Sequence, residues 1–479
     1  MPEQKSYPEA ERNRLLRRVD WRFLLADPQP QRIICFADGS MAEALRLISD
    51  AVVVSPRPRD LGGPGDMTPD GATLFDLAVV TNPSRTDLRA AWQALRPGGA
   101  LYGDWQGLLT TRARVAKDLV RAGFTAPACY WPTGAPERAA AGAWLPLSAP
   151  GALRYYAESR SAVKGIVRRA LRRAQGLTLR VLGGTGVAIP LCAVAYKPPA
   201  GKDHVDALRG RSQEWQPVQM HQLLLTGGLR SINKPVRLVF ADGEMEPRLA
   251  VKMARVPESL PALANEAAIL EAVHDRGGEE LPGVPRVVSF DERGGELCET
   301  ALTGAPLWAQ LSRSNFAALA AKAADWQVAL AGDALAAPRE TWWERLAGCQ
   351  LSWFRNAFGA AVDESLLQQA VDALQRLPDL PLVCEQRDFS PWNVLLKDGE
   401  FVVLDWESAE LNGLPALDLV YFLTYLALFV ERVQVHGVVD VEQVRRVYHQ
   451  TRDPRTELGS VVQRCLATYA RRLGLPLDM

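Results

Sequence analysis

The sequence has few of the residues that build disulfide scaffolds or zinc centres. It contains seven cysteines, an odd number, and five histidines in 479 residues. No CxxC pair and no mixed His/Cys cluster occurs among them. Such spacing neither closes a disulfide framework nor supplies the four ligands of a structural zinc site. We therefore expect a protein of a reducing compartment, the cytoplasm.

An excess of charge of one sign and a long uninterrupted apolar run are also missing. Lys plus Arg number 55, as do Asp plus Glu, so no global field draws the chain to nucleic acid or to a membrane. The longest nearly apolar stretch, 177–196, is broken by Arg180, glycines, threonines and Pro190, which disfavours a spanning helix. The first 18 residues are polar and charged, unlike a signal peptide.

Strand-like and helix-like segments alternate through the first 200 residues. Short apolar strands are expected at 32–37, 51–55, 75–80 and 100–102. A turn is expected at Asp38-Gly39-Ser40, with a helix after it through Ile48, and a second helix at about 85–95. The second helix should stop at a turn, Arg96-Pro97-Gly98-Gly99. This βαβ order predicts a parallel sheet covered by helices, an α/β domain at 1–198. A polar stretch with Pro and Gly, 199–214, is expected to be a linker to a second domain.

Basic residues recur with a helical spacing between 160 and 175, opposite a row of apolar residues. We expect a helix there. Its basic face is either simply solvated or contacts an anionic surface or a partner, and the sequence leaves both interpretations open.

Residues 215–479 begin with strands and continue with helices. Strands are expected at 222–225, 236–240, 249–253, 286–290 and 296–300, and a helix at about 258–275. From 305 onward the pattern is mostly helical. This order predicts an α+β domain with two lobes, a small β-rich lobe at about 215–300 and a helical lobe at about 301–479. A ligand cleft between the lobes is the expected site.

The most informative segment is 384–423, CEQRDFSPWNVLLKDGEFVVLDWESAELNGLPALDLVYFL. Asp388 and Asn393 fall in a predicted loop, and the apolar run 401–404 forms a strand that delivers Asp405 at its end. Phosphoryl transfer needs a group that orients the attacking hydroxyl and oxygen ligands that hold Mg²⁺ beside the nucleotide phosphates. Two carboxylates and a carboxamide in this arrangement suit that chemistry.

Three pieces of this half resemble the aminoglycoside phosphotransferase and choline kinase family, the small-molecule branch of the protein-kinase-like fold. They are Asp388-Phe389-Ser390-Pro391-Trp392-Asn393, Asp405-Trp406-Glu407 and Pro415-Ala416-Leu417-Asp418-Leu419. The resemblance implies that Asp388 orients the acceptor hydroxyl and accepts its proton. It also implies that Asn393 and Asp405 hold Mg²⁺, with supporting roles for Gln386, Glu407 and Asp418.

One position departs from the family pattern. The family usually has His two residues before the catalytic Asp, where this chain has Gln386. That His is usually described as structural, bonded to the backbone of the metal segment. Glutamine carries both a donor and an acceptor and can do the same.

The resemblance also implies a nucleotide site in the small lobe. Lys252, in Ala250-Val251-Lys252-Met253, would contact the α- and β-phosphates and pair with Glu266. Gly227 and Gly228 would belong to the phosphate-covering loop at 226–231, and Glu299 and Thr300 would present backbone groups to the base. Either ATP or GTP fits such backbone recognition.

Four tryptophans lie in the part of the helical lobe that precedes the motif. They are Trp326, Trp342, Trp343 and Trp353. Their role is open between core packing and an aromatic wall for the acceptor, which would suit a sugar face or a cationic amine.

Residues 20–198 resemble a class I, S-adenosylmethionine-dependent methyltransferase, a Rossmann-like fold. The βαβ rhythm, the 95–99 turn, Ala122-Gly123-Phe124 and a closing strand at 191–198 carry this resemblance. It implies a cofactor pocket, to which we assign the positions Asp38, Gly39, Asp76 and Asn82. The first loop, 36–40, has one glycine, and the second strand ends in Ser55-Pro56 without an acidic residue. The sequence therefore predicts a poorly built S-adenosylmethionine site and favours a docking or substrate-presenting domain. An active methyltransferase and another nucleotide-binding role stay open as alternatives.

Taken together, these features predict a cytoplasmic phosphotransferase that uses Mg²⁺ and ATP or GTP and acts on a hydroxyl of a small molecule. Two alternatives stay open from the sequence. One is a catalytically silent binding protein built from two degenerate enzyme folds, and the other is an S-adenosylmethionine-dependent methyltransferase. We expect no nucleic-acid partner and no stable membrane insertion.

Overall fold

The computed structural model describes residues 7–37, 39–55, 74–107, 110–134, 142–161, 190–199, 220–228, 230–277, 281–332, 334, 336–433 and 439–475. The chain forms two compact units. Unit 1 comprises 1–263 and 288–301, and unit 2 comprises 264–287 and 302–479. Among the described residues, no helix combines the length and the hydropathy that crossing a bilayer requires.

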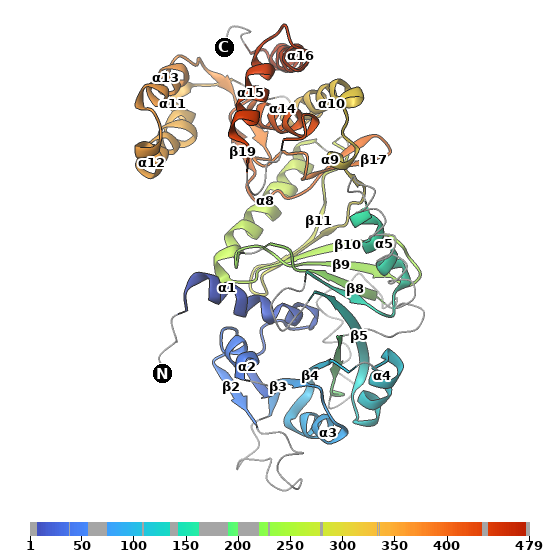
Figure 1. The fold of residues 1–479 in the computed structure, drawn as a ribbon. Helices are drawn as coiled ribbons and strands as arrows, with labels where there is room; N and C mark the ends of the chain where they lie inside the picture. The colour runs from blue at the N-terminus through green and yellow to red at the C-terminus, as the bar shows by residue number, and fades with distance from the viewer. Residues whose placement is uncertain are drawn as a thin grey trace. The chain divides into compact units, whose positions relative to one another are not determined.

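Unit 1 is built on one mixed sheet of twelve strands (Figure 1). In spatial order the strands are β11 (Val287–Asp291), β12 (Glu296–Thr300), β10 (Leu249–Met253), β9 (Val236–Ala241), β8 (Met220–Leu225), β6 (Ala143–Pro146), β5 (Thr125–Thr133), β7 (Leu191–Tyr196), β4 (Leu95–Trp105), β3 (Phe75–Thr81), β1 (Arg32–Phe36) and β2 (Ala51–Val54). The strands expected from the sequence are present in both halves of this sheet.

The N-terminal part of the sheet is parallel at one edge. Strands β2, β1, β3 and β4 pair in parallel, as the βαβ pattern predicts. Strand β7 then lies antiparallel between β4 and β5. The four parallel strands therefore bring their carboxyl ends to the same edge, where the loops after β1, β2 and β3 begin.

Helices cover both faces of this parallel part. Successive residues of a strand point to opposite faces. Ile33 and Cys35 of β1 accordingly join the core that includes residues of α1 (Glu9–Arg18) and α2 (Gly39–Leu45). Ile34 and Phe36 join the core on the other face, with α3 (Arg85–Ala94) and α4 (Arg112–Arg121).

The stretch Arg96-Pro97-Gly98-Gly99 differs from its prediction. We expected a turn, but helix α3 passes directly into β4, and these residues lie within the strand. Phe75 pairs with Leu95 and Leu77 with Ala100, so residues 96–99 form a bulge in β4 opposite Asp76. Gly98 has φ of +78°, and its N–H donates to the carbonyl of Lys197 at 3.0 Å. The glycine is used to bulge the strand and not to end it.

The sheet continues from the N-terminal half into the β-rich lobe. Strand β6 pairs antiparallel with β8, with Ala143 opposite Leu225 and Trp144 opposite Leu224. The linker expected at 199–214 lies, from residue 200 on, outside the described residues. The compact units divide at residues 263 and 264 instead. Polar composition marks an exposed connection, but it does not say whether the strands on either side of it pair.

The basic helix expected at 160–175 is described only at its start. Helix α5 (Pro150–Ser161) ends there, and residues 162–189 lie outside the described part of the chain. Its proposed contact with an anionic surface or partner stays a prediction.

Unit 2 is mainly helical. Its longer helices are α8 (Leu260–Gly277, which begins in unit 1), α10 (Arg313–Ala331), α12 (Cys349–Phe358), α13 (Glu364–Gln375), α14 (Leu417–Val430), α15 (Val441–Arg452) and α16 (Glu457–Arg472). Shorter helical segments are α9 (Leu307–Gln310), α11 (Arg339–Trp342) and the π-helical turn η6 (Trp343–Gly348). Helix α10 packs against α14 and α16, as Figure 1 shows in yellow and red.

Short strands connect the helices of unit 2 and carry the motif. They are β13 (Ala305–Pro306), β14 (Ala336–Ala337), β15 (Leu380–Pro381), β16 (Val383–Glu385), β17 (Val394–Lys397), β18 (Glu400–Val403) and β19 (Glu410–Gly413). Two motif side chains, Phe389 and Trp406, are fully buried in the core of this unit. Phe389 stacks on Trp326 and on Phe422, with centroid distances of 5.1 Å and 4.6 Å. The apolar residues of the motif therefore anchor its polar neighbours to the core.

Candidate active site

Gln386 connects the two halves of the motif. It follows β16, and its side chain is fully buried. Its Nε2 donates to the carbonyls of Leu404 at 3.1 Å and Asp405 at 2.5 Å, and its Oε1 accepts from the N–H of Asp388 at 2.9 Å. One side-chain amide thus ties the Asp388 loop to the Asp405 segment. Glutamine makes the backbone contacts expected of the family's histidine.

Asp418 holds the backbone that precedes Asp388. The buried side chain lies in the first turn of α14 and accepts from the N–H groups of Gln386 at 2.6 Å and Arg387 at 2.9 Å. Arg387 has φ of +64°, an uncommon value for a residue with a side chain. Burial raises the pKa of Asp418 to about 7, and the two N–H donors act in the opposite direction. Asp418 thus contacts the loop's backbone and supports its shape.

Asp388 lies half-buried at the centre of the loop. Asn393 Nδ2 donates to its Oδ2 at 2.7 Å, and the Tyr421 hydroxyl donates to its Oδ1 at 3.4 Å. Burial raises the pKa of the Asp388 carboxyl. The hydrogen bond from Asn393 lowers this pKa, whereas the negative charge of Asp405 raises it further. Such a carboxylate is a stronger base than an exposed aspartate.

A tight hairpin brings Asn393 and Asp405 to the same place. Strands β17 and β18 pair antiparallel across Asp398 and Gly399, whose φ angles are +52° and +83°. Positive φ at both central residues defines the Asp-Gly hairpin turn. Asn393 immediately precedes β17, Asp405 follows β18 by two positions, and the N–H of Leu404 donates to the carbonyl of Asn393 at 2.9 Å. The hairpin therefore converts a separation of twelve positions in sequence into proximity.

The oxygens of this pair fit a hard cation. Asn393 uses its Nδ2 on Asp388, so its Oδ1 points away from that carboxylate. Within the described residues, no group donates a hydrogen bond to that Oδ1 or to the Asp405 carboxylate. The described part of the chain holds no cluster of three or more His, Cys, Asp or Glu that is suited to a metal. Mg²⁺ in proteins is commonly bound by one or two side-chain oxygens together with water or phosphate oxygens, and Asn393 and Asp405 offer two such oxygens.

Asp405 also has a strained backbone. Its φ of +63° lies in the left-handed region, which costs a residue with a side chain about 1 kcal/mol or more. The buried Trp406 that follows donates its N–H to Glu266 Oε1 at 2.8 Å. Asn265 Nδ2 donates to the carbonyls of Glu407 and Ala409, both at 3.0 Å. Helix α8 therefore holds the metal segment by its backbone.

Glu266 and Lys252 belong to different units. In unit 1, Lys252 on β10 forms an ion pair with Glu299 on the neighbouring strand β12, with an Nζ to Oε1 distance of 3.0 Å. Both side chains are buried. Thr300 ends β12 opposite Leu249. The pairing of Lys252 with Glu266 stays a prediction, whereas its contact with Glu299 was not foreseen from the sequence.

The two loop glycines follow β8. Gly228 has φ of +81°, and a Cβ at that position would lie 2.3 Å from the Asn233 side chain. Gly227 has open space around its Cα. Of the two positions, only 228 therefore requires a glycine, because of its positive φ and because a Cβ there would collide with Asn233.

The tryptophans of the helical lobe divide between core and surface. Trp326 and Trp342 are buried in the core of unit 2, and Trp343 packs partly against it. Trp353 is 61% exposed and contacts Phe358 on the same helix, α12. Trp326 and Trp342 therefore serve core packing, one of the two roles that the sequence left open.

An aromatic cluster that the sequence analysis missed lies beside Asp388. Trp392 packs edge-on against Tyr425 at a centroid distance of 4.8 Å, and Tyr425 contacts Tyr421 at 4.7 Å. Tyr421 in turn donates to Asp388. All three rings are partly exposed. The signal was present, because Trp392 lies inside the motif and Tyr421 and Tyr425 are one helical turn apart.

The candidate cofactor residues of the N-terminal half do not gather at one place. Asp38 lies outside the described residues. Gly39 begins α2 after β1, and Asn82 follows β3, so both lie at the carboxyl edge of the parallel strands. Asp76 lies at the opposite end of β3, about 20 Å from Asn82 along the strand.

Asp76 and Asn82 both have structural partners. Asp76 Oδ2 accepts from the N–H groups of Gln31 and Arg32, and its Oδ1 pairs with Arg96 at 2.5 Å. Asn82 Oδ1 accepts from the N–H of Gln106 at 2.7 Å. The Asp76 contacts join the start of β3 to the starts of β1 and β4, and the Asn82 contact joins the end of β3 to the end of β4. The assignment of both residues to one pocket was wrong, because Asp76 lies at the start of the strand and Asn82 follows its end, which separates them by the length of β3.

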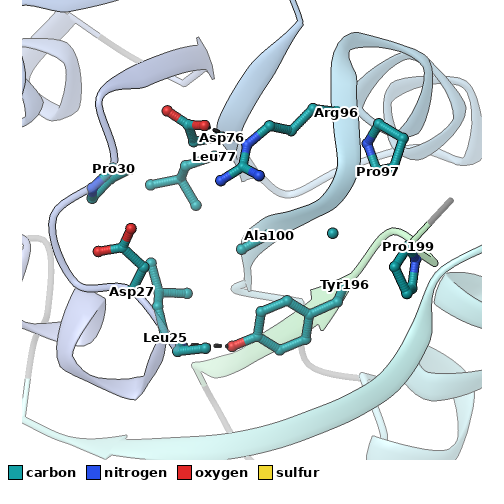
Figure 2. A pocket seen from close by; sticks show the side chains of 12 residues that line it. Leu25, Asp27, Pro30, Asp76, Leu77, Arg96, Pro97, Ala100, Tyr196 and Pro199 are labelled. Carbon is teal, nitrogen blue, oxygen red and sulfur yellow. Dashed lines mark hydrogen bonds and ion pairs between the residues drawn. The ribbon is translucent and has the colours of Figure 1, made fainter. Parts of the chain in front are cut away.

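A small pocket of about 180 Å³ does occur in unit 1, at the amino edge of the parallel strands. Figure 2 shows the Asp76–Arg96 pair, Asp27 and Tyr196 around it. The Tyr196 hydroxyl accepts from the N–H of Ala26 at 3.0 Å. Open α/β sheets bind nucleotides at the carboxyl edge, so this pocket is not at the expected cofactor position.

Comparison with solved structures finds proteins that carry phosphotransferase names. Macrolide 2'-phosphotransferase type I is 16% identical, covering 57% of this chain and 98% of its own, with a TM-score of 0.34. Macrolide 2'-phosphotransferase MphH from Brachybacterium faecium is 15% identical, covering 57% and 90%, with a TM-score of 0.34. Wild-type aminoglycoside 2'-phosphotransferase-IIIa, in a GDP complex, is 15% identical, covering 57% and 90%, with a TM-score of 0.33. At these identities and TM-scores the likenesses say nothing about substrate or site.

The family match is more direct. No curated protein matches the chain. The model of the phosphotransferase enzyme family, in contrast, matches residues 233–453. That range includes Lys252, the hairpin and Asp418, and it agrees with the resemblance seen in the sequence. Residues 233–453 of this chain are thus similar to the phosphotransferase enzyme family.

Proposed function

We propose that this protein is a Mg²⁺-dependent phosphotransferase that moves the γ-phosphoryl group of ATP or GTP to a hydroxyl of a small molecule. The observation that carries the proposal is the hairpin that brings Asn393 and Asp405 together next to Asp388. Phosphoryl transfer depends mostly on positioning and charge stabilisation, and an organised set of three oxygen-bearing side chains supports both.

Asp388 is the residue that we assign to the acceptor hydroxyl. Its Oδ2 is held by Asn393 and its Oδ1 by Tyr421, which fixes the plane of the carboxylate. From this position it accepts the proton of the attacking hydroxyl. Its raised pKa, caused first by burial, makes it a better proton acceptor than a solvated aspartate.

Asn393 and Asp405 are the residues that we assign to Mg²⁺. When bound, the ion would neutralise charge on the phosphates and align the transferring group. The chain's own part is to hold two oxygens at a fixed spacing. Support comes from the hairpin turn, the Leu404 to Asn393 hydrogen bond and the strained φ of Asp405.

The aromatic cluster beside Asp388 supports an acceptor with a flat apolar face or a cationic amine. Trp392, Tyr421 and Tyr425 are partly exposed next to the proposed base. Aromatic faces bind sugar faces and alkylammonium groups. A sugar, an amino alcohol or a glycoside-like metabolite fits this description, and we place the acceptor here and not at Trp326 or Trp342.

The silent-protein alternative rested on Gln386 and on the weak cofactor loop of the N-terminal half. Because the Gln386 amide makes three hydrogen bonds between the loop and the metal segment, its presence gives no reason to expect a collapsed site. The methyltransferase alternative draws little support from the described residues, since Asp76 and Asn82 are engaged at opposite ends of β3. We propose no methyl transfer.

Nucleotide binding is the first test. Melting temperature is measured with ATP, GTP and S-adenosylmethionine, each with and without Mg²⁺, because a ligand selective for the folded state raises it by mass action. We expect a Mg²⁺-dependent rise with ATP or GTP that Asp405→Ala removes. No rise with either nucleotide at several millimolar would contradict the proposal.

The second test separates chemistry from binding. We expect Asp388→Asn to lower kcat by about 10²- to 10⁴-fold, the usual contribution of a general base, with the nucleotide dissociation constant unchanged. Asp405→Ala should instead weaken Mg²⁺-dependent nucleotide binding. Steady-state kinetics and nucleotide titration measure the two effects. Parent-like turnover in both variants would refute the site assignment.

A further inference from the structure

Unit 1 contains a buried ion pair between residues 235 positions apart, Asp20 and Arg255. Their side chains are 1% and 0% exposed. Arg255 Nε donates to Asp20 Oδ1 at 2.9 Å, and Nη2 donates to Oδ2 at 3.0 Å, a bidentate geometry. Asp20 begins the short helix η1 (Asp20–Leu24) near the N-terminus, and Arg255 comes two residues after β10, the strand that carries Lys252.

Arg255 reaches a second target with its remaining nitrogen. Its Nη1 donates to the carbonyls of Arg230 at 3.1 Å and Asn233 at 2.7 Å. These carbonyls belong to the turn that follows Gly227 and Gly228. The guanidinium of Arg255 therefore donates to the Asp20 carboxylate on one side and to the backbone that follows the two loop glycines on the other.

The turn at 230–233 connects Arg255 to Gly228. Asn233 Oδ1 accepts from the N–H of Arg230 at 2.9 Å, which folds the turn onto itself. The Asn233 side chain lies so close to Gly228 that a Cβ there would be 2.3 Å away. A continuous set of contacts thus runs from Asp20 through Arg255 and Asn233 to the loop glycine.

A second N-terminal residue makes an independent contact. Asn13, on α1, accepts with its Oδ1 from the N–H of Ser231 at 3.0 Å. Arg22, on η1, donates from Nη2 to the carbonyl of Arg255 at 2.8 Å. Three side chains of the first 22 residues therefore bond the backbone or side chains around this loop.

The two buried charges explain why Asp20 and Arg255 need each other as partners. A buried guanidinium without a partner is strongly unfavourable, and a bidentate carboxylate is its best partner. Burial raises the pKa of Asp20, and the Arg255 charge opposes that rise. Replacement of Asp20 leaves the buried Arg255 with carbonyl acceptors but no carboxylate, and replacement of Arg255 leaves Asp20 with the charges of Arg22 and Arg17 but without its bidentate partner. The geometry of the loop therefore depends on both residues.

We propose that Asp20, Asn13 and Arg255 are positioning residues through which the N-terminal half holds the glycine loop, described at 226–228 and 230–233, in the conformation that binds nucleotide phosphates. This inference rests on the proposed function, since the loop's nucleotide role is part of it. It assigns to the N-terminal half a part in nucleotide affinity and none in methyl transfer.

The test uses the full-length protein and three variants. Asn13→Ala removes one contact without leaving a buried charge, so it should fold. Asp20→Asn keeps the shape and loses the charge. Arg12→Ala is the matched control, because Arg12 lies on the same helix and makes only an exposed pair with Glu258 at 3.8 Å.

The first measurement needs no nucleotide. Hydrogen exchange of the backbone amides at 230–233 should be at least tenfold faster in Asn13→Ala and Asp20→Asn than in the parent and in Arg12→Ala. Parent-like exchange in folded variants would overturn the positioning role, whatever the protein's activity.

The second measurement uses ATP or GTP with Mg²⁺. The dissociation constant of the nucleotide should rise about tenfold or more in Asp20→Asn and by less in Asn13→Ala, with the acceptor KM unchanged. Faster exchange together with an unchanged nucleotide constant would overturn the proposal. Absence of nucleotide binding by the parent would instead refute the proposed function, and with it the nucleotide part of this inference, while the exchange result would still stand.

Discussion

At the scale of single residues, the surroundings of Asp388 decide its chemistry. Its carboxylate is half-buried, receives hydrogen bonds from Asn393 and Tyr421, and feels the negative charge of Asp405. Burial and Asp405 raise its pKa, and the two hydrogen bonds lower it. The residue is thus tuned by neighbours from three parts of the motif region.

A pH profile follows from these directions. The proposed base works only when ionised, so kcat/KM should fall as the pH drops through its pKa, which lies above the ordinary value of about 3.9. Tyr421→Phe removes a hydrogen bond that lowers the pKa, so the acidic limb should move to higher pH. Profiles of kcat/KM for the parent and this variant measure the shift. A limb that moves to lower pH would contradict the assignment.

Gln386 predicts a stability effect. Gln386→Ala leaves one N–H and two carbonyls buried without their partner, which should cost about 2–4 kcal/mol of unfolding free energy. Gln386→Glu is the matched control, because it has the same shape but loses the donor at neutral pH. We expect it to be no more stable than the Ala variant. Urea unfolding measures both, and a Glu variant as stable as the parent would rule out the donor role.

At the scale of elements, the β17–β18 hairpin is the part that creates the site. Its strands are four residues each, and its Asp-Gly turn has positive φ at both positions. The α14 helix adds Asp418 and Tyr421 from its first two turns, one toward the loop's backbone and the other toward Asp388. Two short elements therefore supply most of the polar groups.

The turn glycine gives a conformational prediction. Gly399 has open space for a Cβ but φ of +83°, so Gly399→Ala should cost about 1–2 kcal/mol through backbone strain alone. Gly359 is the control in the same unit, since its φ is −55° and its nearest contact, Arg355, is at 3.7 Å. Gly359→Ala should be neutral or slightly stabilising. Equal losses in denaturant unfolding would show that the turn geometry is not the cause.

At the scale of the whole molecule, the phosphotransferase-like half is not built separately from the N-terminal half. Strand β8 pairs with β6, and Arg255 is neutralised by Asp20. Both contacts cross the stretch in which the sequence suggested a linker. The family match begins at residue 233, after β8, and so leaves out the strand that joins the halves.

A truncation tests this architecture. A chain of residues 215–479 exposes the edge of β8 and buries Arg255 without its partner, a loss of about 3–5 kcal/mol for the ion pair alone. Since domains are stable by only about 5–15 kcal/mol, we expect aggregation or loss of the cooperative melt of the small lobe. Size-exclusion chromatography and calorimetry against the full chain measure this. A monomeric fragment with the full chain's nucleotide affinity would contradict it.

Much of the catalytic motif could be predicted because it is local. The apolar run of β1, the strand before Asp405 and the six-residue motif loop each depend on neighbours within a few positions, where backbone preference and local composition act. The supporting role of Asp418 came from the family resemblance, because its contacts with the backbone of Gln386 and Arg387 join residues more than 30 positions apart.

The partners that matter most in the two proposals are distant in sequence, and the chain pattern did not reveal them. Asp20 meets Arg255, Tyr421 meets Asp388 and β6 meets β8 only because packing brings them together. Strand pairing and buried ion pairs depend on which edges and charges remain unsatisfied once the local elements have formed. The spacing of Asp388, Asn393 and Asp405 in the sequence was enough to predict the chemistry of the motif. The surroundings that shift the pKa of Asp388, and the contacts that hold the glycine loop after β8, arise instead from residues far apart in the sequence.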